Sequence, residues 1–351
     1  MKVAVVDVAA ESSGALSVLL DFYDYIRHYS PKGICWYFFT SVISLEDTEN
    51  IRTMKSPWIK KSWVCRLIWE KLIFVRQAEK YRFDIVISLQ NKALPVKNVH
   101  QIVYFHNALH FLPFKTVHPF VKMEISVFLY RVLITPYTMR SFKYCQMIVT
   151  QTNAVKTELL KNIGKKHVAV IHPDISVQPC FGENCVKGFL YPCGPVSYKN
   201  HKMIIEAVRR AGKDFRGEIL FTLQGDENRY ARQIKVLSEG FSNIRFIGFL
   251  PREELMKKYE DYGLIFASDV ESFPIPFAEG MAYGTPVIAR DLPYAREILE
   301  NYENRYFYNS TGELAALLKR TGSYKRCKGT CTDEDSSWGK FLKLAVGRDF
   351  Y

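Results

Sequence analysis

Short apolar runs alternate with amphipathic stretches along the chain. In the first half, the apolar runs occupy 2–8, 34–40, 84–89, 101–106, 147–150 and 168–171. Stretches with helical spacing lie between them, at 15–27 and again from Ala154 onward. Apolar runs of about four to eight residues are typical of buried strands, and strands that alternate with helices form parallel sheets. The first half therefore predicts a parallel α/β domain.

The same alternation restarts after an interval rich in Pro, Gly and Asn at 172–184. Its strands are expected at 188–192, 218–224, 244–247, 263–268 and 286–289, and its helices at 202–211, 230–239, 252–259 and 277–283, before a final helix. We therefore expect a first domain over 1–175, a linker over 176–187 and a second α/β domain over 188–335. A last helix over 336–351 can return to the first domain.

The composition is that of an ordinary globular protein large enough for two cores, with 351 residues of which 48% are hydrophobic and 24% charged. The formal net charge is +12, from 48 Lys and Arg against 36 Asp and Glu. Such an excess favours an anionic partner, whether nucleic acid, a phosphorylated ligand or an acidic membrane surface.

Three features of the sequence indicate the cellular compartment of the protein. The eight cysteines are scattered without the paired spacing of a zinc site, which favours reduced thiols in a cytosolic protein. The apolar run from Val3 is interrupted at Asp7, too early for a secretory signal. The stretch 126–139 is broken by Arg131 and Pro136 and is too short to span a bilayer. We expect a cytoplasmic protein, either soluble or peripheral on the inner membrane face.

Two glutamates follow the strand expected at 263–268. Glu271 lies in the loop after that strand, where parallel sheets present ligand-binding groups, and Glu279 is expected in the first turn of the next helix. The helix dipole keeps a carboxylate there ionised, so that it can accept two hydrogen bonds from a vicinal diol such as a ribose. Glu271 can do the same for sugar hydroxyls. Taken singly, each acid can equally be a capping or a solvated residue.

The two acids belong to a longer pattern. Seven residues separate them, and Glu279 is followed by Gly-Met-Ala-Tyr-Gly-Thr-Pro-Val-Ile-Ala. This pattern closely resembles the signature of the family 4, or group 1, retaining glycosyltransferases. Their α/β fold, GT-B, has two Rossmann-like domains facing each other across a cleft. The resemblance implies that Glu271 binds the donor sugar and that Glu279 binds the ribose of the donor nucleotide.

The resemblance extends to Tyr198-Lys199-Asn200-His201. In the family the Lys of this element binds the donor diphosphate, so Lys199 is expected to offset negative charge on the phosphates. Many members carry an Arg a few residues earlier, whereas 194–197 here reads Gly-Pro-Val-Ser and supplies none. A surface lysine at the start of a helix is the alternative interpretation.

The loop between the acids is expected to bind substrate through Ser272, Phe273 and Ile275. Members often have Gly where this chain has Pro274, and proline has no N–H to offer a phosphate, so the Ile275 N–H remains as the donor. The segment 244–250 resembles the family element whose backbone contacts the nucleobase, which assigns that role to Phe249 and Leu250.

In the first domain, His106 closes the run at 101–106 and resembles the family histidine that faces the donor sugar across the cleft. Gly14 lies in the first strand-to-helix turn and resembles the loop near the phosphates. The alternatives are a structural histidine at a strand end and a simple turn, because the turn lacks the three glycines of a dinucleotide fingerprint.

The resemblance implies transfer of a sugar from a nucleotide-sugar donor with retention of configuration, the donor phosphate helping to deprotonate the acceptor hydroxyl. We expect no cofactor and no metal. Asp333-Glu334-Asp335 has the form of a metal-binding Asp-x-Asp, but acidic residues at the start of the helix from Ser336 are the preferred interpretation.

Basic and aromatic residues are mixed in two segments, 52–82 and 111–166. In the second, nine Lys or Arg face only Glu124 and Glu158. Such a mixture suits an anionic bilayer, and it equally fits aromatic residues packed in a core beneath solvated charges. The first option points to a saccharide acceptor linked to polyprenyl diphosphate, in the synthesis of a bacterial surface polysaccharide such as lipopolysaccharide or O-antigen.

Two other functions compete with this prediction. A nucleotide-sugar epimerase can share the GT-B architecture, but the long Glu-to-Glu pattern argues against it. A nucleic-acid-binding protein would use the basic surface, yet no recognised motif supports one.

Overall fold

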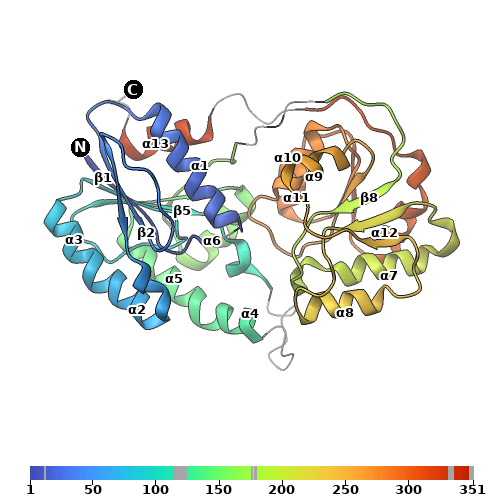
Figure 1. Cartoon of the computed structure of the whole chain (residues 1–351), viewed down its shortest axis with the longest axis horizontal. Coiled ribbons are helices and arrows are strands. Elements are labelled where there is room, and N and C mark those ends of the chain that lie inside the picture. Colours follow the sequence, from blue (N-terminus) through green and yellow to red (C-terminus); the bar gives the residue numbers. More distant parts are fainter. Residues whose placement is uncertain (12, 114–124, 175–176, 178–179, 331–335, 348–351) are drawn as a thin grey trace. The chain divides into compact units, whose positions relative to one another are not determined.

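The computed structural model describes residues 1–11, 13–113, 125–174, 177, 180–330 and 336–347 (Figure 1). It divides into two compact units. The first comprises Met1–Asn107, Val132–Pro173 and Asp335–Tyr351, and the second comprises Ala108–Arg131 and Asp174–Glu334. The chain therefore enters the first unit three times.

The first unit is built on a seven-stranded sheet in the order β3-β2-β1-β4-β5-β6-β7, in which every pair is parallel. The strands are β1 (Lys2–Asp7), β2 (Cys35–Thr40), β3 (Ile51–Lys55), β4 (Ile85–Ser88), β5 (His100–Phe105), β6 (Met147–Thr150) and β7 (His167–Val170). The strand order reverses between β1 and β4, and ligands of open parallel sheets bind at the carboxyl ends of strands beside such a reversal.

The helices of the first unit are α1 (Ser13–Tyr29), α2 (Trp63–Ile68), α3 (Phe74–Tyr81), α5 (Thr135–Ser141), α6 (Asn153–Ile163) and α13 (Ser337–Val346). Short 3₁₀ segments are η1 (Pro57–Lys61) and η6 (Phe142–Tyr144), and η2 (Trp69–Ile73) is a π-helical turn joining α2 to α3. A second π-helical turn, η5 (Tyr130–Ile134), contains the boundary between the units, while η3 (Ala108–Phe111) and α4 (Ile125–Leu129) belong to the second.

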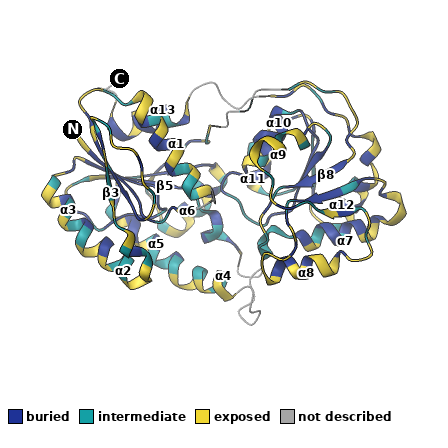
Figure 2. Cartoon of the chain, viewed as in Figure 1, coloured by how far each residue is buried: buried dark blue, intermediate teal, exposed yellow. Residues whose placement is uncertain are grey.

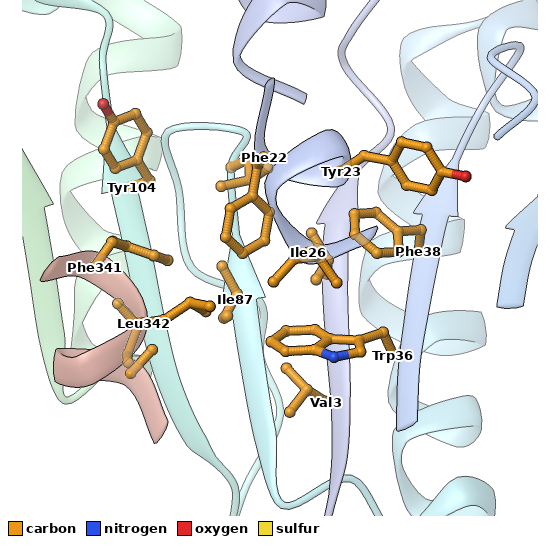
Figure 3. Close-up of a cluster of buried hydrophobic side chains, with 14 of the residues drawn as sticks. Val3, Phe22, Tyr23, Ile26, Trp36, Phe38, Ile87, Tyr104, Phe341 and Leu342 are labelled. Atoms are coloured by element: carbon orange, nitrogen blue, oxygen red, sulfur yellow. The ribbon is translucent and has the colours of Figure 1, made fainter. Parts of the chain in front are cut away.

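Two apolar cores lie on opposite faces of the first sheet, because successive strand residues point to opposite faces. Val3 and Val5 of β1 belong to one core, and Ala4 and Val6 belong to the other. Figure 3 shows the first core, where helix α13 places Phe341 and Leu342 beside Ile87, Tyr104 and Phe22. The ring centroids of Phe22 and Trp338 are 4.9 Å apart. The last helix is thus part of the core of the first unit.

The second unit repeats the design with a six-stranded parallel sheet in the order β10-β9-β8-β11-β12-β13. Its strands are β8 (Gly188–Tyr191), β9 (Glu218–Phe221), β10 (Ile244–Phe246), β11 (Gly263–Phe266), β12 (Val287–Arg290) and β13 (Arg305–Tyr308). Its helices are α7 (His201–Ala211), α8 (Arg229–Leu237), α9 (Arg252–Lys258), α10 (Ile275–Ala282), α11 (Pro293–Ile298) and α12 (Thr311–Lys319), with 3₁₀ segments η7 (Ser197–Lys199), η8 (Gly212–Asp214) and η9 (Thr321–Ser323). Here the order reverses between β8 and β11.

The α/β alternation expected from the sequence is confirmed, and two strands were not foreseen. The sequence Ile51–Lys55 of β3 was interpreted only as part of a basic segment, and β13 lies where only a final helix was expected. Both strands are at the edges of their sheets, where a strand is partly exposed and its sequence lacks a continuous apolar run. Within the described ranges, no helix is long and apolar enough to cross a membrane.

Candidate active site

The loop after β11 carries Glu271 and is fixed by contacts from neighbouring segments. The Asp269 N–H donates to the carbonyl of Tyr198 at 2.8 Å, and the Asn200 amide donates to the carbonyl of Ala267 at 3.0 Å. These bonds join the β11 loop to the segment that contains Lys199, which follows the adjacent strand β8. Arg290 at the end of β12 also forms an ion pair with Asp269. Three neighbouring strand ends therefore converge on this loop.

Lys199 and Glu271 form an ion pair between Nζ and Oε1, although 72 positions separate them in sequence. Their side chains are only 16% and 15% exposed. Burial lowers the pKa of Lys199, but the charge and hydrogen bond of Glu271, together with Cys193 and Tyr198, raise it above its ordinary value. Tyr191 fixes the same segment by donating its hydroxyl hydrogen bond to the Lys199 carbonyl. The structure thus joins two predicted site residues and keeps the ammonium charged.

Glu279 departs from the prediction made for it. Helix α10 begins at Ile275, earlier than expected, so Glu279 lies in the second turn, beyond the main reach of the dipole at the N-terminus. The side chain is 3% exposed, and burial raises the pKa of its carboxyl, a shift that Arg252 and Tyr259 partly offset. The expectation of a first-turn acid kept ionised by the helix dipole was therefore wrong.

Two partners hold the Glu279 carboxyl. The Tyr259 hydroxyl donates to Oε2 at 3.3 Å, and the Arg252 guanidinium lies 3.8 Å from Oε1. Tyr259 is fully buried, while 62% of the Arg252 side chain is exposed. The helix is expected from the sequence over 252–259, but neither residue is among the predicted site residues. The only feature of the sequence that relates the two residues is this shared helix.

The remaining predicted residues of the second unit differ in exposure. Ser272 and Phe273 are buried in the β11 loop, whereas Ile275 at the start of α10 is 43% exposed. Phe249 is 85% exposed, and Leu250 next to it is partly buried. Both follow β10 and the turn at Gly248, whose N–H donates to the carbonyl of Leu223 at 3.0 Å. An aromatic ring thus stands exposed on the loop assigned to the nucleobase.

His106 and Gly14 belong to the first unit, and each is described there by itself. The His106 N–H donates to Asn91 Oδ1 at 2.6 Å, and its ring Nε2 lies 2.9 Å from the carbonyl oxygen of Leu89. Burial lowers the pKa of His106, although the hydrogen bond to Leu89 opposes this shift. Gly14 is exposed at the start of α1, and a Cβ there would meet no heavy atom within 4 Å.

Among the residues that the structure describes, no group of three or more His, Cys, Asp or Glu is placed to hold a metal ion. The sequence Asp333-Glu334-Asp335 lies outside the described residues.

The region that contains these site residues is similar to known proteins. Residues 194–327, which include Lys199, Glu271 and Glu279, match the profile of the family described as "Glycosyl transferases group 1". The O-antigen chain mannosyltransferase RfbU of Salmonella typhimurium is 24% identical over 221 residues. That match covers 62% of this chain and 61% of RfbU, so it spans less than two thirds of the relative.

Solved structures resemble the chain over nearly all of its length. Sucrose-phosphate synthase from Thermosynechococcus elongatus has a TM-score of 0.71 at 14% identity, covering 99% of this chain and 95% of that one. Anabaena HepE, solved with UDP and glucose, has a TM-score of 0.62 at 14% identity, with coverage of 99% and 96%. The apo form of the lipopolysaccharide outer core galactosyltransferase WaaB has a TM-score of 0.59 at 16% identity, with coverage of 92% and 90%.

Two parallel sheets of Rossmann order, matched over their whole length by these structures, give the chain the GT-B fold of glycosyltransferases. Within that fold, the second unit contains the region, residues 194–327, that is similar to the group 1 glycosyl transferases.

Proposed function

We propose that the protein transfers a sugar from a nucleotide-sugar donor to a saccharide acceptor, with retention of the anomeric configuration. One observation carries this proposal: the Lys199–Glu271 ion pair at the carboxyl ends of β8 and β11, inside the region that matches the family. A fixed cation beside a fixed carboxylate suits a ligand that has both phosphates and hydroxyls.

The ion pair leaves both groups with capacity for a donor. An ammonium group has three N–H donors, so Lys199 can bind Glu271 with one and the donor diphosphate with the others. The Glu271 carboxylate has two oxygens and can accept hydrogen bonds from sugar hydroxyls beside Lys199. Glu279 is proposed to accept hydrogen bonds from the ribose, and Phe249 and Leu250 to contact the base. The Ile275 N–H is proposed to donate to a phosphate oxygen.

In the proposed reaction, the bond between the anomeric carbon and the diphosphate oxygen breaks while the bond to the acceptor oxygen forms on the same face. The acceptor proton passes to an oxygen of the departing phosphate. Lys199 lowers the barrier because it offsets the negative charge that grows on the leaving group. With this cation and backbone donors in place, we propose that no metal cofactor is required. His106 and Gly14 are proposed to contact the donor from the first unit.

The acceptor is proposed to be a saccharide of a bacterial surface polysaccharide, such as O-antigen or lipopolysaccharide, carried on polyprenyl diphosphate at the cytoplasmic face of the inner membrane. The names of RfbU and WaaB support this class of acceptor. The net charge of +12 supports contact with an anionic lipid.

The proposal is tested by incubating the protein with a panel of nucleotide sugars, with and without lipid-linked saccharides extracted from bacterial membranes. We expect nucleoside diphosphate to be released only when both substrates are present, and NMR of the product to show the anomeric configuration of the donor. Conversion of the donor sugar without an acceptor would instead identify an epimerase.

A further inference from the structure

One helix of the first unit presents an apolar outer side. Val64, Ile68 and Leu72 are spaced four residues apart along α2 and η2, and their exposed fractions are 62%, 43% and 52%. Figure 2 shows exposed stretches along α2. Trp63 at the start of α2 is 52% exposed. Side chains four residues apart share one side of a helix, so these residues form a continuous stripe. We call Trp63, Val64, Ile68 and Leu72 the apolar face.

The neighbouring helix extends this surface. Tyr137 of α5 packs against Trp63 with ring centroids 6.1 Å apart, and the Lys71 ammonium lies 5.8 Å from the Tyr137 ring. Leu133, one turn before Tyr137, is 61% exposed, and Val132 is 42% exposed. The exposed apolar surface therefore spans two packed helices of the first unit.

The folding of the unit does not require this face to be apolar. The opposite side of the same helix already supplies the core with Trp69 and Phe74, both fully buried. It also carries Glu70, which is 1% exposed and binds Lys92 Nζ at 2.5 Å and Arg66 Nε at 2.9 Å. An outer side that faces water is normally polar, and a contiguous apolar patch at such a place marks an interaction surface.

The charged residues beside the apolar face indicate which kind of partner binds it. In 57–76 the only acidic residue is Glu70, and it is buried in ion pairs. Lys61 and Lys71 are exposed beside the apolar face, and Arg76 is exposed one helical segment further on. Apolar and aromatic side chains bordered by lysines bind the headgroup region of an anionic bilayer, where the side chains enter the acyl boundary and the cations meet the phosphates.

We propose that the apolar face, bordered by Lys61 and Lys71, docks the protein on an anionic lipid bilayer. The proposal is independent of the transfer chemistry, although a lipid-linked acceptor gives it a purpose. The segment 52–82 could place its aromatic residues either in a core or on a membrane surface. Under this proposal it does both, because Trp69 is buried in the core and Trp63 belongs to the docking surface. Phe114 and Phe120 of the second segment lie outside the described residues.

The test is sedimentation of the full chain with vesicles of phosphatidylglycerol and phosphatidylethanolamine, and with vesicles of phosphatidylcholine alone. We expect the wild type to sediment with the anionic vesicles and to be released by salt. The triple variant Val64→Ser, Ile68→Ser, Leu72→Ser is expected to bind at least about tenfold more weakly. The double variant Lys61→Glu, Lys71→Glu is expected to lose the preference for anionic vesicles.

Matched controls come from the second unit. Val236 is 61% exposed, almost as much as Val64, and Lys213 is exposed like Lys71. Val236→Ser and Lys213→Glu should leave vesicle binding unchanged. Thermal stabilisation by UDP and the other nucleoside diphosphates, unchanged in the triple variant, shows that the fold and the donor site are intact and separates this test from that of the proposed function.

Three results would overturn the proposal. One is a wild type that stays in solution with anionic vesicles at low salt, and another is a triple variant that sediments as well as the wild type. The third is a wild-type dimer in analytical ultracentrifugation that the triple variant dissociates while neither binds vesicles, because the face would then be covered by a second copy of the chain.

Discussion

At the scale of single residues, the chemistry of the candidate site depends on contacts between side chains that lie far apart in sequence. Lys199 and Glu271 could each be named from sequence, because a family pattern marks them. Their ion pair could not, because it depends on the pairing of β8 with β11. The same holds for Tyr259, whose hydrogen bond to Glu279 of α10 needs the end of α9 to lie beside that helix.

The Lys199→Met variant tests the role of the cation. We expect kcat/KM for sugar transfer to fall by about 10²- to 10³-fold, because charge on the leaving diphosphate loses its fixed partner. Steady-state kinetics measures this fall. Lys202→Met, at an exposed position on α7, serves as the control and should stay near the wild-type rate. A Lys199→Met enzyme with unchanged kcat/KM would contradict the role.

Asp7 gives a prediction for stability against pH. The carboxyl is 1% exposed at the end of β1, its Oδ1 accepts the N–H groups of Ala9 and Ala10, and burial raises its pKa from 3.8 to about 6. Because the pKa of Asp7 is raised in the folded state, the contribution of its protonated carboxyl to the free energy of unfolding is fully present below pH 3.8. This contribution is lost as the pH rises through about 6. Asparagine keeps the accepting oxygen and never ionises.

We therefore expect Asp7→Asn to match the wild type near pH 4 and to exceed its free energy of unfolding by about 3 kcal/mol at pH 8, since a shift of about two pKa units is worth about that much. Urea unfolding at both pH values measures the difference. A variant less stable than the wild type at pH 8 would show that ionised Asp7 stabilises the fold.

At the scale of elements, the hydrophobic pattern predicted most strands and helices because the central strands are buried on both faces and carry continuous apolar runs. It missed the edge strands β3 and β13, in each of which only one residue is fully buried. It also placed the start of α10 at Phe277 rather than Ile275, although Pro276 fits the first turn of a helix.

The turn between α10 and β12 gives a prediction for one glycine. Gly284 has a φ of +64°, and a Cβ there would lie 1.9 Å from the carbonyl oxygen of Cys327. We expect Gly284→Ala to lower the free energy of unfolding by about 3 kcal/mol or more, because backbone strain and a steric clash add. Chemical denaturation measures the loss.

Gly212→Ala separates the two causes. Gly212 has a φ of +59°, but nothing lies within 4 Å of its Cβ position. Its substitution should cost less, about 1 to 2 kcal/mol, from the strained backbone conformation (φ +59°, ψ −140°) alone. Equal losses at the two positions would rule out the clash as the larger cause at Gly284.

At the scale of the whole molecule, the two units follow one design, a parallel sheet whose strand order reverses at its centre, and the last helix joins the first unit rather than the second. The sequence predicts this return only weakly, because the apolar residues of 337–346 fit a helix packed on either sheet. The core that receives them is visible only in three dimensions (Figure 3).

Phe341→Ala tests this return. The ring is fully buried in the core of the first unit, so its removal should cost about 3 to 5 kcal/mol in the stability of that unit. Hydrogen exchange should accelerate at the amides of β1 and β4 and stay unchanged at those of β8 and β11. Leu344→Ala, a 39% exposed position on the same helix, is the control. Equal acceleration in both units would contradict the assignment of α13.

The central claim is that the second unit binds a nucleotide sugar through Glu279 and its neighbours, and ligand-induced thermal stabilisation tests it most directly. We predict that one nucleoside diphosphate of a panel raises the melting temperature of the wild type and of Glu253→Gln, an exposed control on α9. Glu279→Gln should bind it roughly 10- to 100-fold more weakly, because hydrogen bonds to a charged acceptor are lost.

The same measurement, repeated at several pH values, tests how nucleotide affinity depends on pH. Because burial raises the pKa of Glu279, wild-type affinity should fall on acidification at a higher pH than for an ordinary glutamate, and this dependence should be absent in Glu279→Gln. Stabilisation by one nucleotide that is lost in Glu279→Gln and kept in Glu253→Gln is the result that the account predicts. No stabilisation by any nucleotide, or equal stabilisation of both variants, would contradict it.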